Sequence, residues 1–354
     1  MQARRCNAAG IVVGRWPSAQ RAGQDPRYPM SDGTLHPTDR ADESPRSWDV
    51  LFDLWLLKQA VYPLIDQAIS RTKLSADDFG LYLMVGDFQP VSPGDIATYS
   101  GMRANTVSAA IQRMDRRGHV VRTPNEHDGR SILVALSDTG LAVTAEAIDA
   151  ARLVMERLDP LMDIRSGQQA IERLNDAVRV LANLPPRVRL TEQQDPSWNM
   201  LLYDLWLLKQ ASYPLIEQAI DSTGLSAEEL GLYLLIGEFQ PVSPRGISRN
   251  SGMRPNTVSA TLQRLESRGH IARQPNENDG RSILVTLTEE GLRTTHAAAA
   301  GNQLLLDRLG DLIDVGDAQM AIDQVNQAVR RVANLPPRLP SAGSVATSAA
   351  PTGG

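Results

Sequence analysis

The chain has little cysteine, few aromatic residues and no long apolar run. Its 354 residues include a single cysteine, Cys6. A disulfide framework, a cysteine-based zinc site and a thiol switch are therefore excluded from the rest of the sequence. Aromatic residues make up 5% of the chain, which argues against an all-β sandwich and suits helices rich in Leu, Ala and Ile. No apolar run approaches the ~20 residues that a membrane-spanning helix requires.

The sequence also lacks an excess of positive charge, metal-ligand spacings and catalytic motifs. Lys and Arg number 36 against 41 Asp and Glu, a net charge of -5. This average gives no electrostatic argument for a nucleic-acid partner, although averages hide local clusters. The five histidines show no metal-ligand spacing, and there is no Gly-rich phosphate loop, nucleophile–histidine pair or placeable carboxylate pair. We therefore expect no enzyme activity, no cofactor and no metal.

We expect the start of the sequence not to be a secretory signal. Residues 1–29 contain five arginines but no apolar core followed by a small-residue cleavage site. We expect a cytoplasmic, nucleoid-associated protein. Met30 is an alternative start to Met1, and the intact mass of the native protein distinguishes the two.

One long segment occurs twice. The seven residues from Asp53 to Gln59 return unchanged from Asp204, 151 positions later, and those from Asp128 to Val134 return unchanged from Asp279. No insertion breaks this offset between Asp53 and Pro186. A repeat of this length is a whole domain, not a solenoid unit. The sequence therefore predicts two copies of one domain in series.

The repeat divides the chain into five parts. Residues 1–45 and 339–354 are rich in small and polar residues without periodicity, and are predicted to be disordered tails. The copies occupy residues 46–186 and 197–338, with a linker at 187–196. Because ten extended residues reach at most about 35 Å, the two domains must stay close together.

Apolar periodicity predicts a mainly helical domain with one β-hairpin in each copy. Pro63 should kink or split the first helix. Ser75, followed by two aspartates, is typical of the capped start of the second helix. In the first copy the expected helices cover residues 48–70, 75–86, 93–99, 104–117, 138–158 and 167–183, and the expected strands cover 119–123 and 131–136.

Two short helices joined through Gly101 are typical of a helix-turn-helix. In the second of them, Val107, Ile111 and Met114 recur at helical spacing and are predicted to face the core. The outward positions hold small and hydrogen-bonding side chains, which suit a helix that enters a major groove. The predicted DNA-contacting residues on the two helices are Arg103, Asn105, Thr106, Ser108, Ala109, Gln112 and Arg113, and Arg254, Asn256, Thr257, Ser259, Gln263 and Arg264.

Positive charge is concentrated on the predicted helix-turn-helix and the start of the hairpin, although the chain is acidic overall. Residues 93–122 contain five arginines against two aspartates, and residues 244–273 contain six arginines against one glutamate. Arg245 and Arg249 belong to the second copy alone, so we expect it to bind phosphates more strongly, and the preferred site to be an imperfect palindrome. Of these arginines, Arg122 and Arg273 belong to the hairpins, whose tips add Arg130 and Arg281. A basic hairpin tip of this kind can enter a minor groove.

These segments resemble the multiple-antibiotic-resistance regulator (MarR) family. The resemblance is carried in the first copy by the run from Gly101 to Ser108, by Arg116-Arg117-Gly118, by Asp128-Gly129-Arg130 and by the run from Leu136 to Gly140, and it covers both copies nearly end to end.

The resemblance implies winged helix-turn-helix domains that pair through their first and last helices on pseudo-palindromic operators. It further implies repressors that are often released by small aromatic ligands. Arg130 and Arg281 would enter the minor groove, and Asp128 and Asp279 would orient the wing by ion pairing. The chain departs from the family in carrying two domains. It also lacks the first-helix cysteine of redox-sensing members, which disfavours oxidation sensing.

The sequence therefore predicts a regulator that binds specific double-stranded DNA, acts as a repressor, and forms an intramolecular pseudo-dimer from its two winged helix-turn-helix domains. Three alternatives stay open: a protein-interaction module that lost DNA binding, a ligand-sensing protein, and further association of two chains. His119 and His270 are expected to be structural. A pocket for a small aromatic effector is a second hypothesis for residues that otherwise serve as plain core, namely Trp55, Tyr62, Tyr82, Trp206, Tyr213 and Tyr233.

Overall fold

The structure is a computed structural model that describes residues 49–126, 129, 131–187, 197–277 and 282–337. The predicted tails and residues 188–196 of the predicted linker lie outside the described residues. The first copy consists of α1 (Asp49–Ala68), η2 (Ser70–Thr72), α2 (Ala76–Phe88), α3 (Pro93–Ser100), α4 (Ala104–Arg116), β1 (Val120–Pro124), β2 (Ile132–Leu136), α5 (Asp138–Leu158), η3 (Asp159–Leu161) and α6 (Ile164–Leu181).

The second copy repeats this order except for η3, which confirms the predicted fold class of a mainly helical chain with two winged helix-turn-helix domains in tandem. Its elements are α7 (Ser197–Ala219), η4 (Asp221–Thr223), α8 (Ala227–Phe239), α9 (Pro244–Ser251), α10 (Pro255–Ser267), β3 (Ile271–Pro275), β4 (Ile283–Leu287), α11 (Glu289–Gly310) and α12 (Val315–Val332).

Short polar side chains define where the helices of the first copy begin. The predicted cap at Ser75 is present, since its hydroxyl accepts a hydrogen bond from the backbone N–H of Asp78 at 3.0 Å. Ser92 caps α3 and Ser137 caps α5 in the same way. The wing is an antiparallel pair in which Val120 lies opposite Leu136. Val91, just before α3, forms a β-bridge with Val134, and so joins the wing to the helix-turn-helix.

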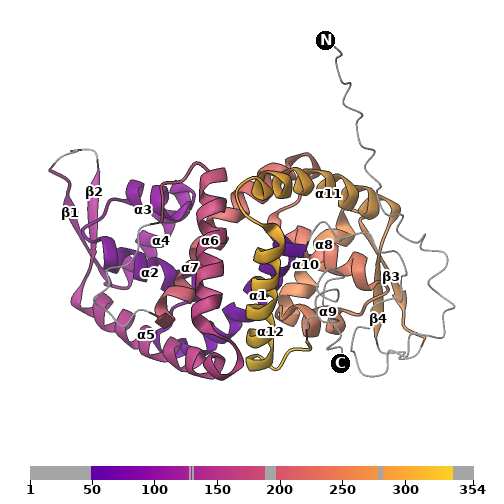
Figure 1. Ribbon diagram of the computed structural model, residues 1–354, viewed down its shortest axis with the longest axis horizontal. Helices are drawn as coiled ribbons and strands as arrows, with labels where there is room; N and C mark the ends of the chain where they lie inside the picture. Colours follow the sequence, from indigo (N-terminus) through magenta and orange to yellow (C-terminus); the bar gives the residue numbers. More distant parts are fainter. Residues whose placement is uncertain (1–48, 127–128, 130, 188–196, 278–281, 338–354) are drawn as a thin grey trace, which may run out of the picture.

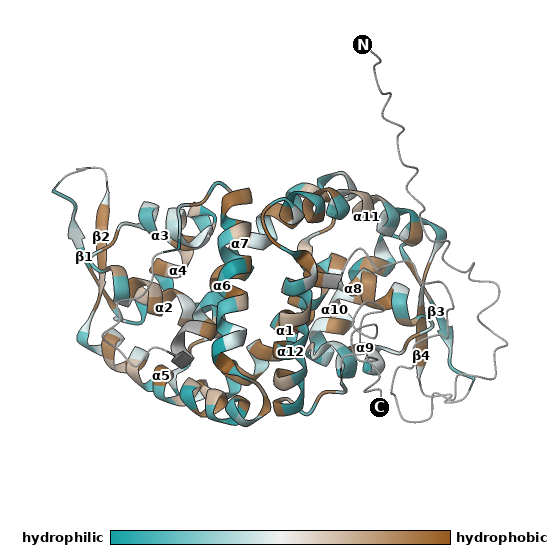
Figure 2. Cartoon of the chain, in the orientation of Figure 1, coloured by the Kyte–Doolittle hydropathy of each residue, from teal (hydrophilic) through white to brown (hydrophobic). Residues whose placement is uncertain are grey.

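The two copies exchange their first helices. α1 packs against α12 of the second copy, α7 packs against α6 of the first, and α6 contacts α12. Figure 1 shows α6 and α12 in the middle of the molecule, with the hairpins β1–β2 and β3–β4 at opposite ends of its long axis. Figure 2 shows apolar residues on β2 and β4, whose inward side chains join this core. Buried residues of both copies form one apolar cluster, so the copies share a single core.

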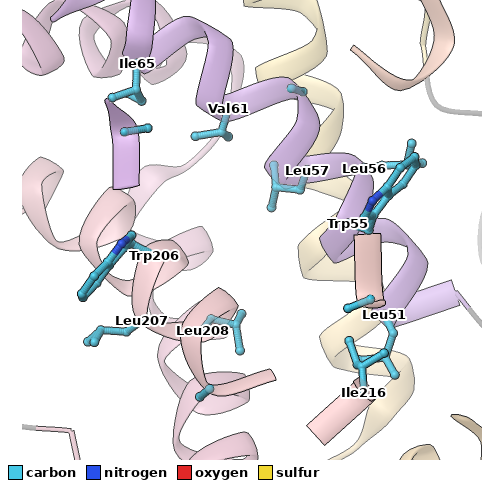
Figure 3. Packing of buried hydrophobic residues seen from close by; sticks show 14 of the residues in the cluster. Leu51, Trp55, Leu56, Leu57, Val61, Ile65, Trp206, Leu207, Leu208 and Ile216 are labelled. Carbon is cyan, nitrogen blue, oxygen red and sulfur yellow. The ribbon is translucent and has the colours of Figure 1, made fainter. Parts of the chain in front are cut away.

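Two tryptophans interlock the copies. Trp55 of α1 lies on Gly231 of α8, where an added Cβ would come within 2.2 Å of the indole. Trp206 of α7 lies on Gly80 of α2, where an added Cβ would come within 2.4 Å. Both indoles are buried, and Figure 3 shows them among the apolar residues of α1 and α7. Each copy therefore provides a flat glycine surface for an aromatic residue of the other.

Pro63 was expected to kink or split the first helix, and the split does not occur. α1 runs without interruption from Asp49 to Ala68 with Pro63 inside it. A proline cannot donate to the carbonyl four residues earlier, here that of Gln59. This carbonyl is covered by the second copy, since a Cβ on Gly252 would lie 2.9 Å from the Gln59 oxygen. Packing along its length keeps α1 continuous, and the same arrangement holds for Pro214 in α7.

A buried ion pair fixes the start of the linker. The Arg187 side chain is 3% exposed and lies 3.0 Å from a carboxylate oxygen of Asp204 and 3.2 Å from one of Glu172. Burial raises the pKa of Asp204 to about 7, although Arg187 and Gln168 act to lower it. The first residue of the linker, Arg187, is therefore bound to α7, the first helix of the second copy.

Candidate nucleic-acid interface

The helices α4 and α10 each have a buried apolar row and an exposed polar row. Val107, Ile111 and Met114 are at most 2% exposed, which confirms the inward face predicted for α4. Val258, Leu262 and Leu265 fill the same positions of α10. The residues predicted to contact DNA are exposed on both helices, as are Arg245 and Arg249 on α9.

The first turns of α4 and α10 carry no acidic side chain. The neighbouring helices α2, α5, α8 and α11 all do. An acidic residue there usually offsets the partial positive charge that a helix carries at its N-terminus. α4 and α10 therefore present this charge at the exposed end of each polar row, where an anion such as a phosphate is favoured.

The arginines at the starts of these helices bind the other copy. Arg103 lies 2.7 Å from Glu217 of α7, and Arg254 lies 2.8 Å from Asp66 of α1. About two thirds of each arginine side chain remains exposed, at 68% and 66%. Ion pairs this exposed add little stability, so their main consequence is to orient each arginine at the N-terminus of its helix.

Arg113 and Arg264 lie at the edge of the polar row and face their own copy. Arg113 and Arg117 both bind Asp78 of α2 at 3.1 Å. Arg264 binds Glu229 of α8 at 3.4 Å, and Arg268 binds the same carboxylate at 3.1 Å. Burial raises the pKa of Glu229, but hydrogen bonds from Ser226, Arg268 and Arg264 outweigh it, and the pKa lies below its usual value. Asp78 was noted only as one of two aspartates after the Ser75 cap, and the role of Asp78 and Glu229 as anchors of α4 and α10 was missed.

The wing is anchored at its base in both copies. Arg122 lies 3.1 Å from Asp115 and Arg273 lies 2.9 Å from Glu266, each at the end of the preceding helix. The hydroxyl of Tyr82 lies 2.8 Å from Nδ1 of His119, and Tyr233 and His270 form the matching pair. Burial, followed by the charge of Arg117, lowers the pKa of His119.

These pairs place His119 and His270 in the structural role expected of them. Of the predicted wing residues, Asp128, Arg130, Asp279 and Arg281 lie outside the described residues.

The turn of each helix-turn-helix rests on the first helix of the other copy. Gly101 and Gly252 end α3 and α9 with φ values of 81° and 88°, which a residue with a side chain rarely adopts. A Cβ on Gly252 would lie 2.9 Å from the carbonyl oxygen of Gln59, and one on Gly101 would lie 3.5 Å from that of Gln210. These carbonyls are the two that Pro63 and Pro214 leave without a helical donor.

A buried arginine joins each helix-turn-helix to the last helix of its own copy. Arg179 of α6 donates to the carbonyl oxygens of Tyr99 and Pro185, both at 2.8 Å. Arg330 of α12 donates to those of Asn250 and Pro336, at 2.6 and 2.7 Å. Burial lowers the pKa of Arg179. The position of α3 and α9 is therefore fixed by the shared helical core as well as by their own domain.

The six aromatic residues proposed for an effector pocket do not line one common cavity. Tyr62 and Tyr213 line a cavity of about 20 Å³ together with Lys58 and Lys209, which leaves room for about one water. The two tryptophans pack on glycines, and Tyr82 and Tyr233 are paired with histidines.

The carboxylates beside this cavity differ between the copies. Glu228 accepts hydrogen bonds from Trp55 at 3.1 Å and Tyr213 at 3.0 Å. Its counterpart Asp77 accepts from Tyr62 at 3.2 Å, and the Nε1 atom of Trp206 is buried without a hydrogen-bond partner. Asp77 is one methylene shorter than Glu228, which accounts for the missing bond.

Within the described residues, no group of three or more His, Cys, Asp and Glu side chains is placed to hold a metal ion. None of the helices in the described residues combines the length and the apolar character of a membrane span.

The described geometry defines a tandem winged helix-turn-helix protein. A family model described as "MarR family" matches residues 79–131 and 223–282, one segment in each copy. The chain is 26% identical over 98 residues to the HTH-type transcriptional repressor Rv2887 of Mycobacterium tuberculosis, covering 28% of this chain and 70% of that protein. It is 27% identical over 88 residues to the regulator PecS of Dickeya dadantii, covering 24% of this chain and 53% of PecS.

Two solved structures are also similar. A mutant MarR of E. coli complexed with operator DNA shares 22% identity, covering 30% of this chain and 78% of that chain, with a TM-score of 0.29. CouR of Rhodococcus jostii bound to p-coumaroyl-CoA shares 25% identity, covering 36% of this chain and 89% of that chain, with a TM-score of 0.29. The relatives are transcriptional regulators, not enzymes. Each of the two tandem domains thus contains one segment that matches the MarR-family model.

The contact between Gly252 and α1 can be tested with a matched pair of substitutions. Gly252→Ala and Gly269→Ala both place alanine at a positive φ, 88° and 73°, but a Cβ on Gly269 would have nothing within 4 Å. Both variants should lose about 1–2 kcal/mol from backbone strain. Gly252→Ala should lose a further ~1–3 kcal/mol because its methyl group meets α1. Urea unfolding measures both losses, and equal values would contradict the cross-copy contact.

Proposed function

We propose that the protein is a transcriptional regulator that binds specific double-stranded DNA and represses the genes beside its operator. One chain supplies both recognition helices as an intramolecular pseudo-dimer. The observation that carries this proposal is the polar row of α4, which is seated on a buried apolar row and whose predicted DNA-contacting side chains recur in α10. The protein is then expected on chromosomal DNA.

Direct base recognition is assigned to the middle of each polar row. Asn105 and Gln112 in α4, and Asn256 and Gln263 in α10, are exposed side chains of the types that pair with adenine in the major groove. Small residues between them, Ser108 and its counterpart in α10, permit close approach to the bases. The acid-free helix starts are suited to phosphates.

The wings are assigned to the minor groove. Arg122 and Arg273 are exposed on β1 and β3 and lead towards the tips. We propose that Arg130 and Arg281 enter the groove, where the negative potential is strongest, and that Asp128 and Asp279 orient the wing by ion pairing.

Repression and release by a small aromatic effector complete the proposal. Rv2887 is named a repressor, and CouR was crystallised with p-coumaroyl-CoA. In this chain the cavity beside Tyr62 and Tyr213 lies between α1 and α7, the helices on which the two helix-turn-helix turns rest. A ligand that separates these helices would move the recognition helices apart.

A salt titration tests the electrostatic part of the proposal. The duplex used is one selected by the protein from random sequences. Each phosphate contact should steepen the fall of affinity by roughly 0.9 log units per decade of salt. With six to ten contacts, affinity should fall by about 10³–10⁵ between 50 and 200 mM salt. A flat response, or no enriched duplex, would contradict the proposal.

Base recognition is tested by Gln112→Ala combined with Gln263→Ala. If both glutamines bind bases, discrimination at one position of each half-site should fall by about 1–3 kcal/mol. Binding to duplexes with each substituted base pair measures this change. Gln303→Ala, at a half-buried glutamine of α11 that donates to Asp307 of the same helix, is the control and should leave base preference unchanged. If the double variant keeps the full discrimination of the unmodified protein, the assignment of these side chains is wrong.

A further inference from the structure

The predicted DNA-contacting side chains of the two recognition helices are the same in both copies. Every predicted outward residue of α4 from Arg103 to Arg113 has an identical counterpart in α10, from Arg254 to Arg264. All of these residues are exposed. If they read bases, as the proposed function requires, both helices read the same bases.

The helices that precede them differ in charge. α3 carries Gly94, Asp95 and Thr98, whereas α9 carries Arg245, a glycine and Arg249 at the matching positions. All five of the named residues are exposed. The second copy therefore gains two positive charges and loses one negative charge on this short helix.

The arginines of α9 lie on one exposed side of the helix. Arg245 and Arg249 are four residues apart and so share a face, while Ile247 and Ser251 are buried. The first helix of a helix-turn-helix crosses the DNA backbone. Arg245 also occupies the first turn of α9, which has no acidic residue. In α3 that turn contains Asp95, whose carboxylate accepts a hydrogen bond from Ser92 at 2.7 Å and would repel a phosphate.

The first copy has its extra charge elsewhere. Arg116 is exposed in the last turn of α4, and Ser267 replaces it in α10. The copies therefore differ in where each places positive charge as well as in its amount.

We infer that the chain holds DNA unequally through the phosphates while it reads equal bases with both recognition helices. This inference rests on the proposed function. The expected DNA site is then a palindrome in its bases and not the imperfect palindrome expected from the sequence. Arg245 and Arg249 hold the phosphates of only one of its two flanks. On such a site the chain binds in either of two orientations.

Phosphate neutralisation tests the inference. A palindromic duplex selected by the protein is prepared with methylphosphonates in neither, one or both flanks. Neutralising one flank should weaken binding only about twofold, because the chain turns its α3 side to that flank and loses one of two equal orientations. Neutralising the second flank should cost about tenfold or more, since the charged contacts then have no partner.

Two exchange variants serve as matched controls. Arg245→Gly combined with Arg249→Thr makes α9 resemble α3, and should make binding insensitive to either flank. It should also reduce the salt dependence by about 1.8 log units per decade, 0.9 for each contact. Gly94→Arg, Asp95→Gly and Thr98→Arg together make α3 resemble α9, and should make each neutralised flank cost the same.

The outcomes separate the two levels of the proposal. Equal losses at the first and second flank in the unmodified protein would overturn the unequal grip and leave the proposed function intact. Selection of two different half-site sequences would overturn the equality of base reading. If no duplex is bound, the proposed function fails, and this inference fails with it.

Discussion

The exchange of first helices between the two copies is the constraint on which the rest of the structure depends. A helix that carries a large aromatic residue needs a surface without side chains against which to lie, and each copy provides it through a glycine of the other. Trp55 and Trp206 therefore complete a core that neither copy closes alone. Duplication within one chain makes this exchange independent of protein concentration, because the partner helix is always attached.

The same exchange sets the position of the helix-turn-helix elements. A proline in each first helix leaves one carbonyl without its helical donor, and the glycine turn of the opposite copy covers that carbonyl. Arg103 and Arg254 add ion pairs to the same helices. The relative placement of α4 and α10 is thus a property of the shared core. A change in the separation of α1 and α7 would therefore move both recognition helices.

Local patterns predicted most of the fold. The apolar spacing of Val107, Ile111 and Met114 and the cap at Ser75 depend on neighbours in sequence, and both were found as expected. Features that depend on distant partners were missed. Asp78 reads as a helix-start residue, and nothing nearby in sequence indicates that it holds two arginines of α4. Local sequence could not decide between a kink and a split at Pro63 for the same reason, since the surface that covers the Gln59 carbonyl comes from the second copy.

All residues of the two polar rows were predicted to contact DNA, but the structure shows that they have different partners. Asn105 and Gln112 are exposed, whereas Arg113 is tied to its own domain. The roles of the aromatic residues could not be predicted, because their spacing in the sequence does not show whether a ring packs on a glycine or lines a cavity. The role of each ring depends on which helix of the other copy lies beside it once α1 and α7 are exchanged.

The central claim is that one chain is a complete operator-binding unit. The most direct test is the stoichiometry of the complex with a selected duplex, measured by native mass spectrometry together with a footprint of the same complex. The account predicts one chain per duplex and protection of two half-sites whose centres lie about one helical turn apart, roughly 10 base pairs. Two chains on such a duplex, or one chain that protects a single half-site, would contradict it.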